Sequence, residues 1–232
     1  MKKLKMLAVA LGALVVTSSA FAVPTLYIWD TGGGAGSGAI IPVPAGTGIA
    51  TYANASFDGA WSVVISTSET KPALGSATAP AMDLNVQATS LGVAGRDLHV
   101  SWSDDGFGPF NSSLTATMTG HVVTGTGSGV RYQSFYQAGA GVFGAATLVP
   151  VPPWVALTDS GVLPAPTYMN VQIGGPINQA SFGLVQFVTL TAVPGGAYSL
   201  DASIGGAPDG GTTVMLLGAA LSGLAFLRRK MA

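Results

Sequence analysis

Hydrophobic and polar side chains alternate along much of the chain between residues 61 and 204. In the first such segment Trp61, Val63 and Ile65 share one face, and serines at positions 62 and 66 lie on the other. A period of two is typical of a strand with one buried and one solvent-facing side. The pattern predicts strands over residues 61–67, 84–89, 98–103, 114–119, 130–137, 168–173, 182–191 and 198–204.

Clusters rich in Gly, Pro and Asp separate the predicted strands. They occupy residues 30–34, 104–109, 125–129 and 194–196. Each cluster favours a turn, because glycine and proline adopt the backbone angles that tight turns need. No ten-residue helical period appears between the two ends of the chain. We therefore expect an all-β fold, a single antiparallel β-sandwich of jelly-roll-like type over residues 23–205.

The first 22 residues have the order of a secretory signal peptide. They contain lysines at positions 2, 3 and 5, an apolar stretch over residues 6–16, and small residues that end in Ala20, Phe21 and Ala22. The Ala-x-Ala spacing predicts a signal helix that is removed by cleavage after Ala22, so that the mature chain begins at Val23. A retained signal anchor is the alternative.

The C-terminal segment, residues 206–232, has three parts in a fixed order. The first is a small, turn-prone motif over residues 207–211, with Pro208, Asp209, Gly210 and Gly211. The second is an uncharged, largely apolar run over residues 212–227, and the third is a basic tail over residues 228–232 with Arg228, Arg229 and Lys230. A Pro-Asp-Gly-Gly sequence favours an open turn that a protease can bind.

The apolar run predicts a short transmembrane helix. As a helix, residues 212–227 would measure about 24 Å, somewhat less than the ~30 Å hydrocarbon core of a bilayer. The cations that follow can reach the headgroup layer and fix this end in the cytoplasm. The alternative is a buried helix of a soluble domain. It fits poorly, because the run has no polar face.

This three-part order resembles the PEP-CTERM class of bacterial sorting signals, and most closely its variants built around Val-Pro-Asp-Ser/Gly-Gly. Two departures stand out. Ala207 occupies the usual valine position, and Asp209 follows proline where the commonest form has Glu-Pro. The resemblance implies recognition by an exosortase, a membrane-embedded Cys transpeptidase-like enzyme, in a Gram-negative-type bacterium. It also implies an inner-membrane-tethered intermediate, followed by transfer to the cell surface or extracellular matrix.

The body of the chain has a looser resemblance to the β-rich passenger domain that accompanies many of these signals. The residues that carry it are 71–77, Asp83, Leu84, 100–104 and Phe107. The resemblance implies no activity for this domain.

Charge and composition exclude some classes of function. Residues 23–211 contain three Lys or Arg and ten Asp or Glu, and therefore carry a formal charge of −7. A basic surface is required to bind nucleic acid, so we expect no such partner. The chain has no cysteine, which rules out disulfides and acylation at a cysteine.

Motifs that carry enzymatic chemistry are absent. The chain has no Gly-x-Ser-x-Gly, no His-Glu-x-x-His and no Gly-x-x-x-x-Gly-Lys. His99 and His121 fall on polar faces of predicted strands. We read Gly32–Gly34 as a flexible loop and Leu163–Thr167, which mimics a sortase motif, as a plain loop. We therefore expect no enzymatic activity, no cofactor and no metal site.

Two binding alternatives remain open. Asp104 and Asp105 precede a glycine, and clustered carboxylates could form half of a Ca²⁺ loop, although a hairpin turn fits better. The tryptophans could stack on sugar rings. Trp61 and Trp102 share a face with Val and Ile, so we expect them in the core, whereas Trp154 follows a Pro-rich stretch and is the candidate for sugar contact.

Three classes of function follow, in order of preference. The first is a secreted surface or matrix protein with a structural or interaction role, and the second is a lectin-like carbohydrate-binding module. The third is an extracellular enzyme. The expected partners are an exosortase-like enzyme, the membrane through the C-terminal helix, and an extracellular polysaccharide.

Overall fold

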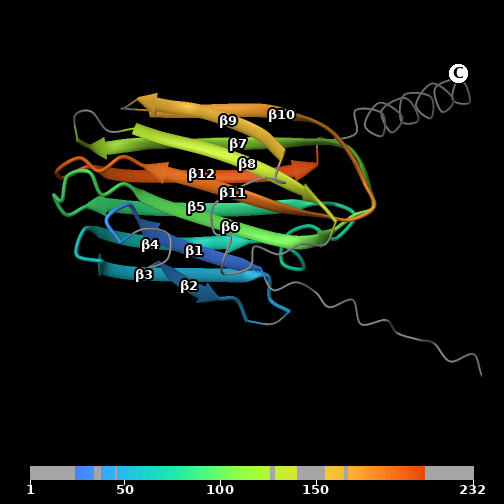
Figure 1. Ribbon diagram of the computed structural model, residues 1–232, viewed down its shortest axis with the longest axis horizontal. Coiled ribbons are helices and arrows are strands. Elements are labelled where there is room, and N and C mark those ends of the chain that lie inside the picture. Colours follow the sequence, from blue (N-terminus) through green and yellow to red (C-terminus); the bar gives the residue numbers. More distant parts are fainter. Residues whose placement is uncertain are drawn as a thin grey trace, which may run out of the picture.

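A computed structural model of the protein describes residues 24–33, 38–44, 46–125, 129–139, 155–164 and 167–206 (Figure 1). Within these ranges the chain forms twelve strands and no helix. The strands are β1 (Thr25–Asp30), β2 (Ala39–Pro42), β3 (Ile49–Phe57), β4 (Trp61–Glu69), β5 (Ala81–Ser90), β6 (Leu98–Phe107), β7 (Phe110–Thr124), β8 (Gly129–Ala138), β9 (Val155–Pro164), β10 (Thr167–Gln179), β11 (Phe182–Leu190) and β12 (Ala197–Gly206).

The strands form two six-stranded sheets. Sheet A has the order β2-β1-β6-β11-β8-β9, and sheet B has the order β10-β7-β12-β5-β4-β3. Every paired strand runs antiparallel to its neighbour. Strands β2 and β3 lie together at one edge of the molecule, and β9 and β10 lie together at the other (Figure 1). The all-β, antiparallel prediction is confirmed, and the jelly-roll type stays a prediction.

The two sheets share one hydrophobic core. Leu26 and Val100 of sheet A belong to the same buried cluster as Val63 and Leu84 of sheet B. The indole N–H groups of the two core tryptophans are also paired. The indole N–H of Trp61 donates to the carbonyl of Arg96 at 2.6 Å, and that of Trp102 donates to the carbonyl of Glu69 at 3.0 Å. Both indoles are fully buried, as the alternation predicted.

Each of the eight predicted strands lies within or overlaps a strand of the structure. The strands β1, β2, β3 and β9 were not predicted. Residues 26–30 of β1 are all buried, so both faces of this strand are apolar and no alternation marks it. Strand β2 has only four residues, and β3 consists largely of small residues that give little hydrophobic contrast.

Two predictions about turns are wrong. Asp104 and Asp105 lie within β6 and are buried, where we expected a hairpin turn or half of a Ca²⁺ loop. A strand can bury these two residues because Lys71 Nζ binds the carboxylate of Asp104 and the backbone carbonyl of Asp105. The pairing of β6 with β11 also has a register shift at this point. The segment 163–167 is not a plain loop either, since β9 ends at Pro164 and β10 begins at Thr167.

Other predictions fall outside the described residues. They are the signal peptide with Ala20 and Ala22, the sorting motif over 207–211, the transmembrane helix over 212–227, the basic tail over 228–232, and Trp154. The described residues contain no helix of the length and apolar character that a membrane span requires.

Candidate functional site

Side chains from five strands of sheet A meet on its outer face, which is turned away from the core. The strand registers place them in rows. In one row Trp29 lies opposite His99, His99 opposite Thr189, Thr189 opposite Arg131, and Arg131 opposite Val162. In the next row Phe187 lies opposite Gln133. Because paired positions bring Cβ atoms close together, residues far apart in sequence form one surface.

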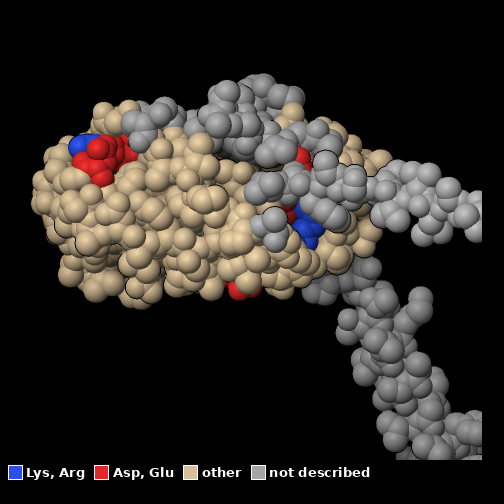
Figure 2. All heavy atoms as spheres, turned by 90° about the horizontal axis from the view of Figure 1, so that it is seen from below, with Lys and Arg blue, Asp and Glu red and all other residues tan. Residues whose placement is uncertain are grey.

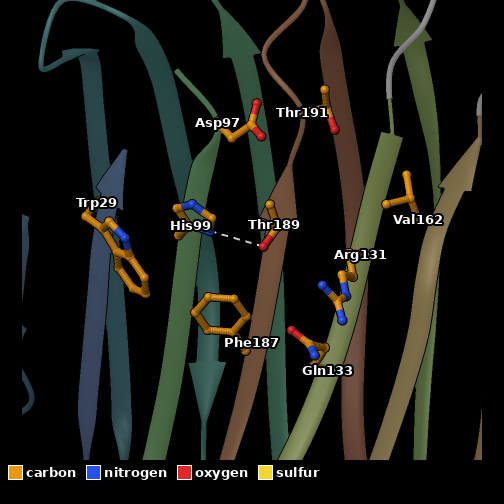
Figure 3. A pocket seen from close by; sticks show the side chains of 9 residues that line it. All are labelled: Trp29, Asp97, His99, Arg131, Gln133, Val162, Phe187, Thr189 and Thr191. Atoms are coloured by element: carbon orange, nitrogen blue, oxygen red, sulfur yellow. Dashed lines mark hydrogen bonds between the residues drawn. The ribbon is translucent and has the colours of Figure 1, made fainter. Parts of the chain in front are cut away.

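This surface is hollowed into a pocket of about 470 Å³ (Figure 3). The lining residues are Trp29, Asp97, His99, Arg131, Gln133, Val162, Phe187, Thr189 and Thr191. The volume lies within the range of about 300–1,000 Å³ that is typical of small-molecule sites. We call these nine residues the sheet A pocket.

One side of the sheet A pocket is aromatic. The ring centroid of Trp29 lies 5.0 Å from that of His99 and 5.4 Å from that of Phe187. Tyr27 stacks on Trp29 from the neighbouring row at 4.8 Å. The backbone of Gly38 lies against this stack, because a Cβ at that position would stand 2.6 Å from the Tyr27 ring. The packing fixes the rings in place, so this side of the pocket is rigid.

The opposite side is polar and cross-linked by hydrogen bonds. The Nε of Arg131 donates to Asp159 Oδ1 at 3.0 Å, and a second guanidinium nitrogen binds the other carboxylate oxygen. The Gln133 amide donates to Asp159 Oδ2 at 2.9 Å. Between the two sides, His99 Nδ1 lies 3.1 Å from Thr189 Oγ1 (Figure 3). The polar groups are therefore held in defined orientations.

The electrostatics of the sheet A pocket favour a neutral imidazole and a paired guanidinium. Burial lowers the pKa of His99 from its ordinary value of 6.5, and the negative charges of Asp97 and Asp30 oppose this only in part. The hydrogen bond from Arg131 lowers the pKa of Asp159, and the same bond raises the pKa of Arg131. Asp97 is itself engaged, because its Oδ1 accepts the backbone N–H of Ala192 at 2.8 Å.

The other cations of the described region are also paired with carboxylates. Lys71 Nζ lies 2.6 Å from Asp104 Oδ2, and Arg96 bridges Asp30 and Asp58. Figure 2 shows the result on one face, where charged side chains form a few small groups on a wide uncharged surface. This face therefore offers no basic patch of the kind that nucleic acid requires.

Sequence reasoning found part of this site. It counted Trp29 among four tryptophans that could stack on sugar rings, although it preferred Trp154, and it placed His99 on a polar strand face. The structure brings Trp29 and His99 together. His121 lies on β7 of sheet B, away from the pocket. The residues Arg131, Gln133, Phe187 and Thr189 were missed as site residues, because only the strand registers show that they meet. Each was on a predicted strand, which is the one signal that the sequence offered.

The described residues show no metal centre. No group of three or more His, Cys, Asp or Glu within them is arranged to hold a metal ion. The Ca²⁺ alternative at Asp104 fails for a more specific reason, because Lys71 and Thr70 bind Oδ2 of Asp104 and the backbone N–H of Asp105 binds Oδ1.

The comparison with known families concerns the other end of the chain. Residues 208–231 match the VPDSG-CTERM motif. The chain carries a VPDSG-CTERM sorting signal. The match includes Pro208, Asp209, Gly210 and Gly211 and the cations Arg228, Arg229 and Lys230, so the PEP-CTERM-like signal predicted from the sequence is confirmed. No curated protein matches the chain.

The VPDSG-CTERM signal indicates an exported protein that is tagged for a surface or extracellular route, and it is consistent with processing by an exosortase-like enzyme. The β-rich body is consistent with the passenger domain that the sequence led us to expect. The signal and the sheet A pocket are thus two separate candidate sites, one for sorting and one for binding.

Proposed function

We propose that this protein is a secreted surface or extracellular-matrix protein whose C-terminal tail is removed during sorting. The observation that carries the proposal is the VPDSG-CTERM match over residues 208–231. In this proposal the N-terminal signal directs export, and cleavage after Ala22 releases the mature N-terminus. The short helix over 212–227 then holds the body on the outer face of the inner membrane.

In this proposal the position of the intermediate makes the motif accessible to cleavage. The cations at 228–230 hold the end of the tail at the cytoplasmic side, so Pro208 and Asp209 lie near the outer interface. A Pro-Asp-Gly-Gly sequence there offers an extended, side-chain-poor backbone to a membrane-embedded enzyme. The logic parallels a GPI signal, in which small residues precede a removable apolar tail.

The β-domain takes a structural or interaction role in this proposal and is not an enzyme. Two sheets over one core form a scaffold that needs neither disulfide nor cofactor. Its three cations are each neutralised by a carboxylate, and its outer faces expose mainly uncharged polar side chains. Such a surface suits a protein that works among polysaccharides, which are its proposed extracellular partners.

A lectin-like binding module is the second candidate, and one observation favours it. The sheet A pocket combines aromatic rings with oriented hydrogen-bonding groups, as sugar sites do. Sequence reasoning had placed the sugar contact at Trp154, whereas the pocket includes Trp29.

The sorting proposal is tested by replacing both Pro208 and Asp209 with Ala in the native host. We expect export to continue and the tail to stay attached, so that the unprocessed form accumulates in the inner membrane. The matched control replaces Thr212 and Thr213 with Ala, just beyond the motif, and should be processed like the parent. If the Pro208/Asp209 variant is still trimmed and sorted, the segment is only a C-terminal anchor.

A further inference from the structure

The sheet A pocket presents two chemically different sides at a short distance from each other. Trp29 and Phe187 supply the apolar side, and Arg131 and Gln133 supply the polar side (Figure 3). His99 lies between them, stacked on both rings at centroid distances of 5.0 and 5.7 Å. A ligand that fills the pocket must therefore have an apolar face and several polar groups at its rim.

The charges of the pocket disfavour an anionic ligand. Arg131 is bound by both oxygens of Asp159, so its charge is already neutralised. A lowered pKa keeps His99 neutral at neutral pH. Asp97 accepts a backbone N–H and keeps its negative charge, so the pocket offers an anion no free positive charge. Desolvating an anionic ligand here would cost free energy with no compensating partner.

The hydrogen-bonding groups suit hydroxyls. Gln133 carries both a donor and an acceptor, and among the described residues only its N–H₂ group is used, toward Asp159. The Nε2 of His99 has no hydrogen-bond partner among the described residues, because the bond to Thr189 involves Nδ1. Thr189 and Thr191 add hydroxyls that can donate or accept. Neighbouring hydroxyls of a sugar ring match such a mixed set of planar amide, imidazole and hydroxyl groups.

We propose that the sheet A pocket binds an uncharged sugar unit of a glycan. The C–H face of the sugar packs against the small exposed parts of Trp29 and Phe187, and its hydroxyls bond to Gln133 and His99. Trp29 is 4% exposed and Phe187 is 7% exposed. Because little of either ring is exposed, the polar side supplies most of the specificity. Val162 is 68% exposed, and its cross-strand neighbour Arg131 is also exposed. The pocket therefore opens to solvent beside these two residues and admits a residue of a longer chain.

The chain offers an internal control for a direct test. It contains two histidines, His99 in the pocket and His121 on the exposed face of sheet B. The experiment uses the full chain in a detergent without a sugar headgroup and follows the imidazole NMR signals. The probes are cellobiose, maltose, lactose and diacetylchitobiose at about 10 mM, tenfold above a weak millimolar dissociation constant. Digalacturonic acid is the charged probe.

We expect at least one neutral disaccharide to shift the His99 signals in a saturable manner and to leave those of His121 unchanged. The charged probe should have no effect. If no neutral probe moves His99, if both histidines move together, or if only the charged probe acts, the proposal is wrong.

Variants on one strand separate pocket binding from general effects. Gln133→Ala should weaken binding of the active disaccharide at least about tenfold, the equivalent of 1.4 kcal/mol. Gln137→Ala is the matched control, because Gln137 lies on the same face of β8 but outside the pocket, and it should bind like the parent. Unchanged His121 signals show that each variant is folded. Equal affinities in the two variants would overturn the assignment.

This test is independent of the sorting proposal. The pocket lies within the β-domain, and its ligand binding does not require that the tail be cut. A failure of tail processing would therefore leave the NMR result unchanged, and a failure of sugar binding would leave the sorting result unchanged.

Discussion

Lys71 and Asp104 form an ion pair between the loop after β4 and the interior of β6. The Nζ and Oδ2 atoms lie 2.6 Å apart, and the two side chains are 10% and 0% exposed. The ammonium group also lies 4.1 Å from the centroid of the Phe107 ring. The carboxylate accepts a further hydrogen bond from Thr70 at 2.8 Å. This network joins the β4–β5 connection, which follows a strand of sheet B, to sheet A.

Removal of Lys71 should therefore lower the stability of the folded protein. Lys71→Ala leaves Asp104 buried without its counter-charge, and we expect a loss of about 3–5 kcal/mol in the free energy of unfolding. Arg131→Ala is the control, because its pair with Asp159 is 44% and 38% exposed and should contribute less than about 1 kcal/mol. Urea denaturation of both variants measures the difference. Similar losses would show that burial of the Lys71 pair does not matter.

A second prediction concerns an amide in the core. Gln186 on β11 is fully buried, and neither polar atom of its amide has a hydrogen-bond partner among the described residues. A buried polar group without a hydrogen-bond partner lowers the free energy of unfolding by about 1–3 kcal/mol. Gln186→Leu removes the penalty and should raise the free energy of unfolding by about this amount.

The control for Gln186 is an exposed glutamine. Gln87→Leu on the outer face of β5 should change stability by less than about 0.5 kcal/mol. A destabilised Gln186→Leu variant, measured by the same denaturation, would mean that the amide is satisfied or that leucine does not fit.

The third prediction concerns pH. Burial raises the pKa of Asp83 from 3.8 to about 6, and the nearby charges of Asp201 and Glu69 add to this. The register places Asp83 directly opposite Glu69 on β4. The folded state thus binds the proton more tightly than the unfolded chain does. The contribution of Asp83 to stability is fully present below about pH 4 and is lost as the pH rises toward 6.

Replacement of Asp83 isolates this effect. Asp83→Asn should stabilise the protein at pH 7 by about 1 kcal/mol, since partial exposure screens much of the ~2.7 kcal/mol that a two-unit shift represents. The gain should vanish near pH 3, where the parent carboxyl is protonated in both states. Denaturation curves at pH 3, 5 and 7 provide the measurement, and a gain that is independent of pH would rule out this cause.

The sequence was sufficient for much of the fold because the sheets have one buried and one wet face. Trp61, Val63 and Ile65 share one face of β4 and lie in the core as expected. Strand β1 was not predicted because its outer face is also covered, so the large side chains of Tyr27 and Trp29 are nearly as buried as those of Leu26 and Ile28. A period of two cannot mark a strand that is buried on both sides.

The two candidate sites differ in how far the sequence reveals them. The sorting signal is local, since its motif, apolar run and cations follow one another along residues 208–231. The sheet A pocket is formed by residues of five strands. The sequence alone does not show which residue of β6 pairs with which residue of β11. Trp29 and His99 were noted singly, but their contact depends on a register that only the structure supplies.

The central claim is that the tail is removed and the body is passed to the surface or matrix. The most direct test is intact mass spectrometry of the protein recovered from the extracellular fraction of its native host. The account predicts a chain that begins at Val23 and ends before the apolar run at 212–227. A mature chain that still ends at Ala232 would contradict it.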